Sequence, residues 1–406
     1  MNVRLQVWLH LPDGRRVRAG ELVAVYRDNG AIDGQFRYLS SYLDDPEAFP
    51  LDPVNLPLVP GPQDVGRPQA GVHGVFEDAL PDDWGRRMLC RQYGLSDHQA
   101  RPPHLLSLMR GGGMGALLFA REHCPVQETV ERPPMVLQDV ARAALDFEKG
   151  ELKDNDPLLP YLYGVGTSPG GARPKFLFAM DDGKHFLVKL PSLRDTVSPV
   201  PIEAACLATA ADCGFSVARS RLLDEGLALL LVERFDLTSR GGRRHMVSFK
   251  TLLNAEHHYN KSYLDIARLL EIHSADPGAD KAALFRQMLF NACIGNTDDH
   301  LKNFALLHDE QGWRLSPAYD LVPTFPLQAR AEHVLRFNLD NRRPDWINVE
   351  QLGRAFGFST VRTRNLIEQV LTGLSGLEGQ LQQCGVPEET ALSLLRHVAT
   401  YIGQYR

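Results

Sequence analysis

The segment Asn296-Thr297-Asp298-Asp299-His300-Leu301-Lys302-Asn303 sets a carboxylate, Asp298, five positions before a carboxamide, Asn303. A second isolated acid, Asp320, follows in Ala318-Tyr319-Asp320-Leu321. Phosphoryl transfer needs one Asp to accept or orient the proton of the attacking hydroxyl, and an Asn and a further Asp to hold magnesium. The interval from Asp298 to Asn303 also matches the catalytic loop of protein kinases. These residues predict a magnesium-dependent phosphotransferase with Asp298 as base and with Asn303 and Asp320 as metal ligands.

Other assignments remain open within this loop. Asp299 is a rival base, although its shorter separation from Asn303 fits the kinase interval less well. His300 and Lys302 either contact phosphate or stabilise the loop, and a structural hydrogen bond is favoured for His300. Asp298, Asp299 and His300 are also compatible with a metal hydrolase, but that interpretation gives no role to the glycines and lysines upstream.

Composition narrows the class of protein. The 406 residues, of which 44% are hydrophobic and 23% charged, indicate a globular chain with two or three compact units. A net charge of −6 argues against nucleic-acid binding through bulk charge. Six cysteines without a CxxC pair are typical of reduced thiols, so zinc is not expected. No run approaches the ~20 apolar residues of a membrane span, and the alternating N-terminus is unlike a signal peptide. We expect a cytoplasmic protein.

Hydrophobic patterns predict a β-rich part followed by a helical part. Asp13-Gly14 and Asn29-Gly30 separate alternating runs, which is a strong hairpin signal, so the first forty residues are expected to form a meander. Helices are expected near 75–80, 84–93, 136–151 and 201–213, and strands near 117–119, 175–180, 185–191, 228–236, 304–307, 313–315 and 334–337. This order is typical of a two-lobed kinase with nucleotide bound between the lobes.

The same patterns predict four successive segments. These are an accessory module at 1–124, a linker and helix at 125–150, a nucleotide-binding N-lobe at 151–236, and a mainly helical C-lobe carrying the catalytic loop at 237–406.

Two upstream segments are candidates for phosphate contacts. The stretch 167–175 carries Gly170 and Gly171, which let backbone amides approach phosphate, and ends in Lys175; a flexible turn is the alternative. Lys189 lies in an apolar strand, where burial is costly without a counter-charge. A nucleotide phosphate or Glu203 would supply that charge. Alternatively, Lys189 lies on an edge strand and reaches solvent.

The segment 232–236 is expected to connect the lobes. Its backbone N–H and C=O groups at Glu233, Arg234 and Phe235 are placed to pair with an adenine edge. For the side chains, a surface ion pair between Glu233 and Arg234 is an equally good interpretation.

Taken together, the segments 168–175, 188–191, 232–236, 297–303 and 319–320 resemble the HipA serine/threonine-kinase toxins of type II toxin–antitoxin systems. The segments 75–89 and 105–116 resemble the N-terminal domain of that family, so the resemblance spans essentially the whole chain. It implies an α+β, two-lobed protein-kinase-like (HipA-like) fold with a β-rich N-terminal accessory domain and a helical C-lobe.

The resemblance also implies roles for individual residues. Asp298 would be the catalytic Asp, and Asn303 and Asp320 would bind Mg²⁺. Ser168 matches the position at which these kinases autophosphorylate, and a dianion there would repel the phosphates of ATP. The ATP site would comprise Gly170, Gly171, Ala172, Arg173, Pro174, Lys175, Lys189, Glu233, Arg234, Phe235, His300, Lys302, Asn303, Tyr319 and Asp320.

Members of that family phosphorylate translation components, notably an aminoacyl-tRNA synthetase. They are neutralised by a small helix-turn-helix antitoxin (HipB-like) that binds operator DNA, so DNA would be contacted only indirectly and a membrane not at all. Two other functions stay open from the sequence. One is a small-molecule or lipid kinase of related fold, and the other is a non-catalytic co-regulator that binds antitoxin and DNA.

Overall fold

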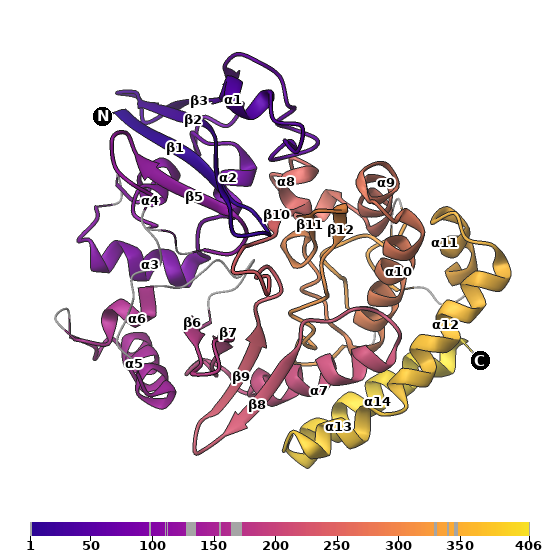
Figure 1. Cartoon of the computed structure of the whole chain (residues 1–406). Helices are drawn as coiled ribbons and strands as arrows, with labels where there is room; N and C mark the ends of the chain where they lie inside the picture. The colour runs from indigo at the N-terminus through magenta and orange to yellow at the C-terminus, as the bar shows by residue number, and fades with distance from the viewer. Residues whose placement is uncertain are drawn as a thin grey trace. The chain divides into compact units, whose positions relative to one another are not determined.

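The computed structural model describes residues 2–96, 99–109, 111, 113–126, 135–153, 156–163, 173–328, 331–338, 341–344 and 348–405. The chain divides into two compact units (Figure 1). The first unit comprises Met1–Val188, Arg234–Asn254 and Leu307–Gln311, and the second comprises Lys189–Glu233, Ala255–Leu306 and Gly312–Arg406. The predicted boundaries at 124, 150 and 236 are not the boundaries of these units and stay a prediction.

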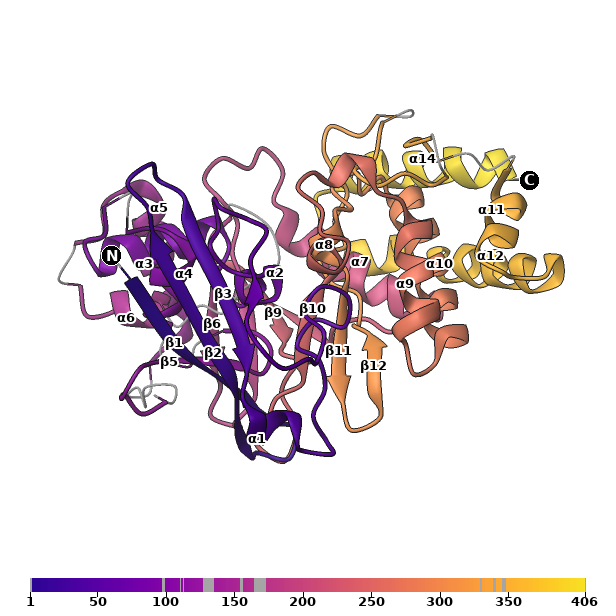
Figure 2. The same cartoon turned by 90° about the horizontal axis from the view of Figure 1, so that it is seen from above.

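A five-stranded antiparallel sheet forms the centre of the first unit (Figure 2). Its order is β4-β3-β2-β1-β5. The strands are β1 (Asn2–His10), β2 (Arg16–Tyr26), β3 (Ile32–Tyr38), β4 (Gln63–Asp64) and β5 (Leu117–Arg121). Alternate residues of β1 are buried, as expected for a strand with one face on a core. Gly14 and Gly30 have positive φ in the tight turns between the first strands. The predicted meander is confirmed.

Short helices accompany this sheet. They are α1 (Ser40–Leu43), α2 (Gly74–Asp78), α3 (Asp83–Gln92), α4 (Pro102–Leu106), α5 (Leu137–Lys149), α6 (Leu159–Tyr163) and α8 (Phe249–Leu252). The first unit also contains β6 (Lys175–Ala179), β10 (His245–Ser248) and β7 (His185–Lys189), except for the last residue of β7. Asp82 is the N-cap of α3: its side chain accepts a hydrogen bond from the backbone N of Gly85 at 3.0 Å.

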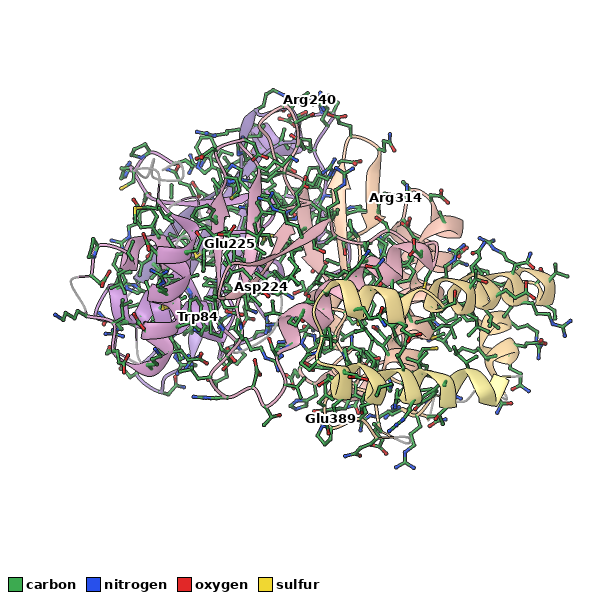
Figure 3. All side chains as sticks on the ribbon, turned by 90° about the horizontal axis from the view of Figure 1, so that it is seen from below. Trp84, Asp224, Glu225, Arg240, Arg314 and Glu389 are labelled. Atoms are coloured by element: carbon green, nitrogen blue, oxygen red, sulfur yellow. The ribbon has the colours of Figure 1, made fainter. Side chains whose placement is uncertain are left out.

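The second unit is mainly helical. Its helices are α7 (Pro199–Asp212), η1 (His258–Asn260), α9 (Tyr263–His273), α10 (Pro277–Ile294), η2 (Leu301–Asn303), α11 (Val349–Ala355), α12 (Thr360–Leu374), α13 (Leu377–Gln383) and α14 (Glu388–Tyr405). Strands β8 (Ser220–Asp224) and β9 (Ala228–Glu233) form an antiparallel hairpin. Asp224 and Glu225 lie at its turn (Figure 3).

Two further strands, β11 (Ala305–Asp309) and β12 (Gly312–Leu315), follow the catalytic loop, and the last three residues of β11 belong to the first unit. The strand predicted at 334–337 is wrong. Arg336 makes only a single bridge to Ser262, and the backbone N–H groups of Val334 and Leu335 donate to the Asp299 side chain instead of to a neighbouring strand.

Helix α10 ends just before the predicted catalytic loop. Asp276 caps its first turn by accepting from the backbone N of Ala279 at 3.0 Å. The helix ends at Gly295, whose φ is 72°. A Cβ there would lie 2.8 Å from His397 Nε2 and 2.9 Å from Leu327 Cδ2, so a larger residue does not fit without displacement. Among the described residues, none of the helices combines the length and apolar character needed to cross a bilayer.

Candidate active site

Lys189, at the end of β7, lies between two carboxylates. Its Nζ donates to Glu203 Oε1 at 2.6 Å and to Asp320 Oδ1 at 2.7 Å, and its side chain is 13% exposed. Burial alone lowers the pKa of Lys189, but the charges of Asp320 and Glu203 outweigh it and raise that pKa above its usual value. The ammonium is therefore charged and oriented. The alternative that Lys189 reaches solvent from an edge strand is wrong, whereas the predicted ion pair with Glu203 is present.

Asp320 lies in a left-handed turn with φ of 59°. Residues other than glycine rarely adopt this conformation, so neighbouring contacts have to hold it. Asn296 Nδ2 donates to the backbone carbonyl of Asp320 at 3.3 Å, and the hydroxyl of Tyr319 donates to the carbonyl of Lys302 at 2.8 Å. The turn is thus joined to the catalytic loop on both sides of Asp298.

The adjacent carboxylates Asp298 and Asp299 have opposite environments. The side chain of Asp298 is exposed. Asp299 is fully buried; its Oδ2 accepts from the Tyr263 hydroxyl at 2.6 Å, and its Oδ1 accepts from the backbone N of Val334 at 2.9 Å. A carboxylate already committed to several donors is a poor proton acceptor for a substrate. The geometry therefore favours Asp298 over Asp299 as the base.

Asn303 presents a buried acceptor without a partner. It is 4% exposed, and its Nδ2 donates to the backbone carbonyl of Asp298 at 3.0 Å. This bond fixes the amide, and within the described residues Oδ1 has no hydrogen-bond partner. Leaving such an oxygen desolvated is costly, and a cation would satisfy it. With the carboxylate of Asp320, it gives the oxygen donors that magnesium prefers.

No group of three or more His, Cys, Asp or Glu side chains in the described part of the chain forms a metal site. A magnesium ion at Asn303 and Asp320 would therefore take its other ligands from phosphate and water, which is common for this ion. The residues present fit the expected metal.

His300 and Lys302 belong to a tight turn. The backbone N of His300 donates to the carbonyl of Asp298 at 2.9 Å, and the backbone N of Asn303 donates to the carbonyl of His300 at 2.8 Å. The second of these bonds closes the 3₁₀ turn η2. The Nδ2 of Asn303 then reaches the backbone carbonyl of Asp298. Nucleotide contacts by the side chains of His300, Lys302 and Tyr319 stay predictions.

The predicted phosphate loop is described only at its end. Ser168, Gly170, Gly171 and Ala172 lie outside the described residues.

The last three residues of that loop can be placed. Arg173 is exposed, Pro174 is buried, and Lys175 Nζ lies 2.7 Å from Asp82 Oδ2. Both charged side chains of this pair are at most 5% exposed, so Lys175 is held within the first unit. Contact between Lys175 and phosphate stays a prediction.

In the segment 232–236, the arginine side chain makes different contacts from those expected. Arg234 is 7% exposed, and its Nη2 donates to Asp236 Oδ2 at 2.6 Å and to the carbonyl of Gly113 at 2.8 Å. The surface ion pair between Glu233 and Arg234 is therefore wrong, because burial and Asp236 take the guanidinium. Phe235 is half-buried. Adenine contacts by Glu233, Arg234 and Phe235 stay predictions.

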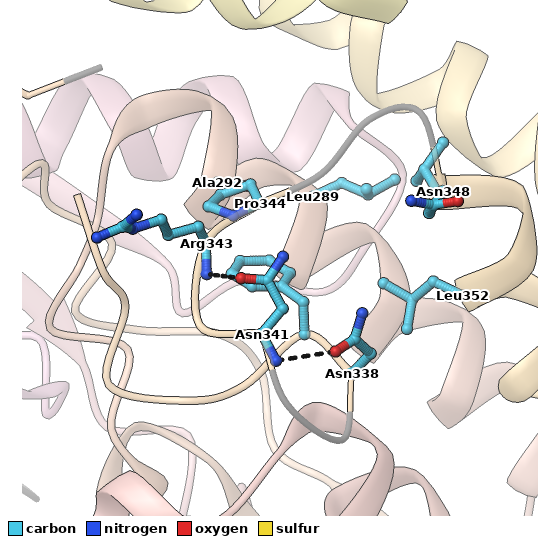
Figure 4. A pocket seen from close by; sticks show the side chains of 10 residues that line it. Leu289, Ala292, Asn338, Asn341, Arg343, Pro344, Asn348 and Leu352 are labelled. Carbon is cyan, nitrogen blue, oxygen red and sulfur yellow. Dashed lines mark hydrogen bonds between the residues drawn. The ribbon is translucent and has the colours of Figure 1, made fainter. Parts of the chain in front are cut away.

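One surface hollow of the second unit lies between α10, α11 and the residues Phe337, Asn338, Asn341, Arg343 and Pro344 (Figure 4). Its walls combine apolar side chains with three asparagines and Arg343. None of the predicted site residues lines it, so it is separate from the candidate active site.

Sequence reasoning missed four buried polar residues around the loop. These are Tyr263, Asn291, Asn296 and His333, each at most 1% exposed. The signal available for two of them was an Asn on either side of Gly295, where the last residues of the helix, 288–294, are otherwise apolar. Tyr263 and His333 gave none, because a buried tyrosine or histidine looks like any other core residue in a sequence.

Comparison with known proteins agrees with this architecture. Residues 167–375 match the HipA-like C-terminal domain, and residues 11–120 match the HipA N-terminal domain. Y4mE of Sinorhizobium fredii, provisionally named as a kinase, is 30% identical over 333 residues, which cover 75% of this chain and 76% of that protein. Toxin YjjJ of Escherichia coli K12 is 22% identical over 312 residues, 70% of this chain and 68% of that protein.

A solved structure extends the comparison to the fold. It is the Shewanella oneidensis MR-1 toxin–antitoxin complex of HipA, HipB and operator DNA. The matched chain has a TM-score of 0.69 and 19% identity, and the match covers 99% of this chain and 96% of that one. At this identity the likeness concerns the fold alone. The predicted HipA-like α+β fold, with its β-sheet N-terminal region and helical C-terminal part, is confirmed.

Proposed function

Because the chain belongs to the HipA family, we propose that it is an ATP- and Mg²⁺-dependent serine/threonine protein kinase that acts as the toxin of a toxin–antitoxin pair. The observation that carries the proposal is the arrangement in the second unit. A charged lysine bridges Glu203 and Asp320, Asp298 is exposed, and the Nδ2 of Asn303 donates to the Asp298 backbone carbonyl while its Oδ1 has no partner among the described residues.

The chemistry follows from these positions. The hydroxyl oxygen of the acceptor would form a bond to the γ-phosphorus of ATP as the bond from that phosphorus to the departing ADP oxygen breaks. The hydroxyl proton passes to the Asp298 carboxylate. Lys189, kept charged by Glu203, pairs with phosphate oxygens. Magnesium held by Asn303 and Asp320 would neutralise phosphate charge.

The substrate and partner are proposed on a different basis. The solved relative is a complex with HipB and operator DNA, which supports a helix-turn-helix antitoxin as the partner of this chain. The net charge of −6 suits a toxin that leaves DNA contacts to that partner. A translation component, such as an aminoacyl-tRNA synthetase, is the proposed phosphate acceptor, and Ser168 is the proposed site of autophosphorylation.

Transfer of radiolabelled phosphate from ATP tests the proposal directly. We expect wild type to label a protein in a cell extract and Asp298→Asn to lose roughly a thousandfold in rate, because transfer depends on positioning and charge. Asp224→Asn, on the exposed β8–β9 turn, is the matched control and should retain full activity. Equal rates for wild type and Asp298→Asn would remove the assigned base. Labelling of sugars or lipids alone would exclude a protein kinase.

A further inference from the structure

A continuous chain of buried hydrogen bonds runs beneath the catalytic loop. Asn296 Nδ2 donates to Asn291 Oδ1 at 3.1 Å, and Asn291 Nδ2 donates to the Tyr263 hydroxyl at 3.2 Å. The hydroxyl donates in turn to Asp299 Oδ2 at 2.6 Å, which also lies 3.1 Å from His333 Nδ1. We call these five residues the Asp299 network. Each is at most 1% exposed.

The donors of the network all point one way. Asn296 and Asn291 donate through their amide groups, and the Tyr263 hydroxyl donates to the carboxylate at the end. Burial, followed by the charge of Asp299, raises the pKa of Tyr263 well above its usual value, so its hydroxyl keeps the proton that it donates. Within the described residues, Asn296 Oδ1 is the one acceptor of the two amides that lacks a partner. A buried chain of hydrogen bonds favours a single arrangement of the groups it joins.

The two ends of the network touch the groups that the proposed reaction needs. At one end, Asn296 Nδ2 also donates to the backbone carbonyl of Asp320 at 3.3 Å. At the other end, Asp299 is covalently next to Asp298, and its Oδ1 accepts from the backbone N of Val334 and of Leu335 at 2.9 and 3.3 Å. The network therefore ties the turn of Asp320, the loop of Asp298 and the segment 333–335 together.

We propose that the Asp299 network positions the Asp298 carboxylate and the Asp320 turn relative to each other, and so sets the rate of phosphate transfer. This inference rests on the proposed function. Its physical basis is that a displacement of ~1 Å at a reacting group can cost on the order of a hundredfold in rate. Asp299 and Tyr263 are thus positioning residues that act through Asp298 and Asp320, without contacting the substrate.

Tyr263→Phe is the central variant, because it removes one hydroxyl and leaves the ring in place against Phe304 and Phe337. Asp299→Asn keeps an acceptor for Val334 and Leu335. We expect kcat to fall about tenfold or more in each, with KM for ATP within about twofold. The double variant should lose little more than the worse single variant, since both remove the same interaction.

Tyr38→Phe is the matched control for lost stability. Tyr38 is also buried, and its hydroxyl donates to the carbonyl of Leu56 and accepts from the backbone N of Leu51, but it lies in the first unit. If kcat falls as far in Tyr38→Phe as in Tyr263→Phe, the network only stabilises the fold, and the inference is overturned. Unchanged kcat in Tyr263→Phe and Asp299→Asn would also overturn it.

Amide hydrogen exchange tests the coupling without relying on activity. We expect Tyr263→Phe to speed exchange in residues 296–303 and 318–322, and Tyr38→Phe to leave both segments unchanged. If exchange in both segments is unchanged in Tyr263→Phe, the proposed coupling through the network is wrong, even if the enzyme is active. Wild type that transfers no phosphate to any acceptor would instead overturn the proposed function, and the positioning role with it.

Discussion

Two clusters of charged side chains, one in each unit, differ in their balance of charge and in whether an acceptor near them lacks a partner. The lysine cluster of the second unit consists of Lys189, Glu203 and Asp320, so it carries one cation and two carboxylates. Its Asp320 side chain is 24% exposed, and the neighbouring Asn303 offers an acceptor that no described residue fills. An excess of negative charge with an open edge suits a divalent cation.

The arginine cluster of the first unit has the reverse balance. It consists of Arg234, Asp236 and Arg243, all at most 8% exposed. Asp236 is shared between Arg234 and the backbone N of Gly115, and Arg243 donates to the carbonyl of Gly111. Burial and then the charge of Arg234 lower the pKa of Arg243 to about 10. These charges are used to join backbone segments of the first unit.

Buried charge alone therefore does not identify a functional site. Both clusters consist of three charged side chains. Of the two, the lysine cluster alone combines a partly exposed carboxylate, Asp320, with the acceptor of Asn303 that no described residue satisfies. It alone contains a residue, Asp320, that the kinase pattern selects. Variants in the two clusters should therefore separate activity from stability.

The largest effect is expected for Lys189→Met. Loss of the ammonium removes the cation that pairs with phosphate, and we expect single-turnover phosphate transfer to fall by about 10²–10³-fold. The measurement is rapid-quench transfer at saturating ATP, with a urea melt to confirm folding. Transfer that stays within threefold of wild type would show that the lysine cluster has only a structural role.

Asp236→Asn should give the converse result. It leaves Arg234 and Arg243 buried with their counter-charge removed, which we expect to cost about 3–5 kcal/mol of unfolding free energy. The rate per folded molecule should stay at the wild-type value. Urea unfolding and active-site titration measure the two quantities separately. If Asp236→Asn is stable but inactive, the proposed difference between a structural and a functional cluster is wrong.

Asn303→Leu probes the unfilled acceptor. Removing Oδ1 should raise the magnesium concentration for half-maximal transfer about tenfold, because one of two protein ligands is lost. The titration is done with ATP held at saturation, and excess magnesium should recover part of the rate. An unchanged magnesium requirement would contradict the assignment of Asn303 as a ligand.

The last prediction concerns pH and the first unit. Burial lowers the pKa of His245 to about 4 from the usual value near 6.5, and its Nε2 lies 2.8 Å from the carbonyl of Leu51. Between these two values the unfolded chain binds a proton that the folded chain does not, so stability falls as pH decreases from 6.5 to 4, by about 1–3 kcal/mol. Urea unfolding at pH 7.5 and pH 4.5 measures this loss, and His245→Gln should reduce it. A loss of equal size in His245→Gln would assign it to other groups.

Residue spacing selected the candidate site residues, whose roles stay predictions, but not the contacts that support them. Asp298, Asn303 and Asp320 follow from short intervals along the chain, and the family resemblance carried the fold. The partners of Arg234 and Asp299 did not follow, because each depends on burial. Asp299 was considered only as a rival base, since nothing local in the sequence shows that Tyr263 and Val334 fold against it.

The pairing of an exposed Asp298 with a buried Asp299 has a consequence for how this loop can vary. Adding one residue between Gly295 and Asp298 would move Asp298 into the buried position that Asp299 occupies, and removing one would move Asp299 into the exposed position of Asp298. A substitution in the loop changes one side chain, whereas a change in its length displaces all of the following side chains at once. The number of residues between the end of α10 and Asp299 is therefore constrained, because Asp299 has to reach the Tyr263 hydroxyl.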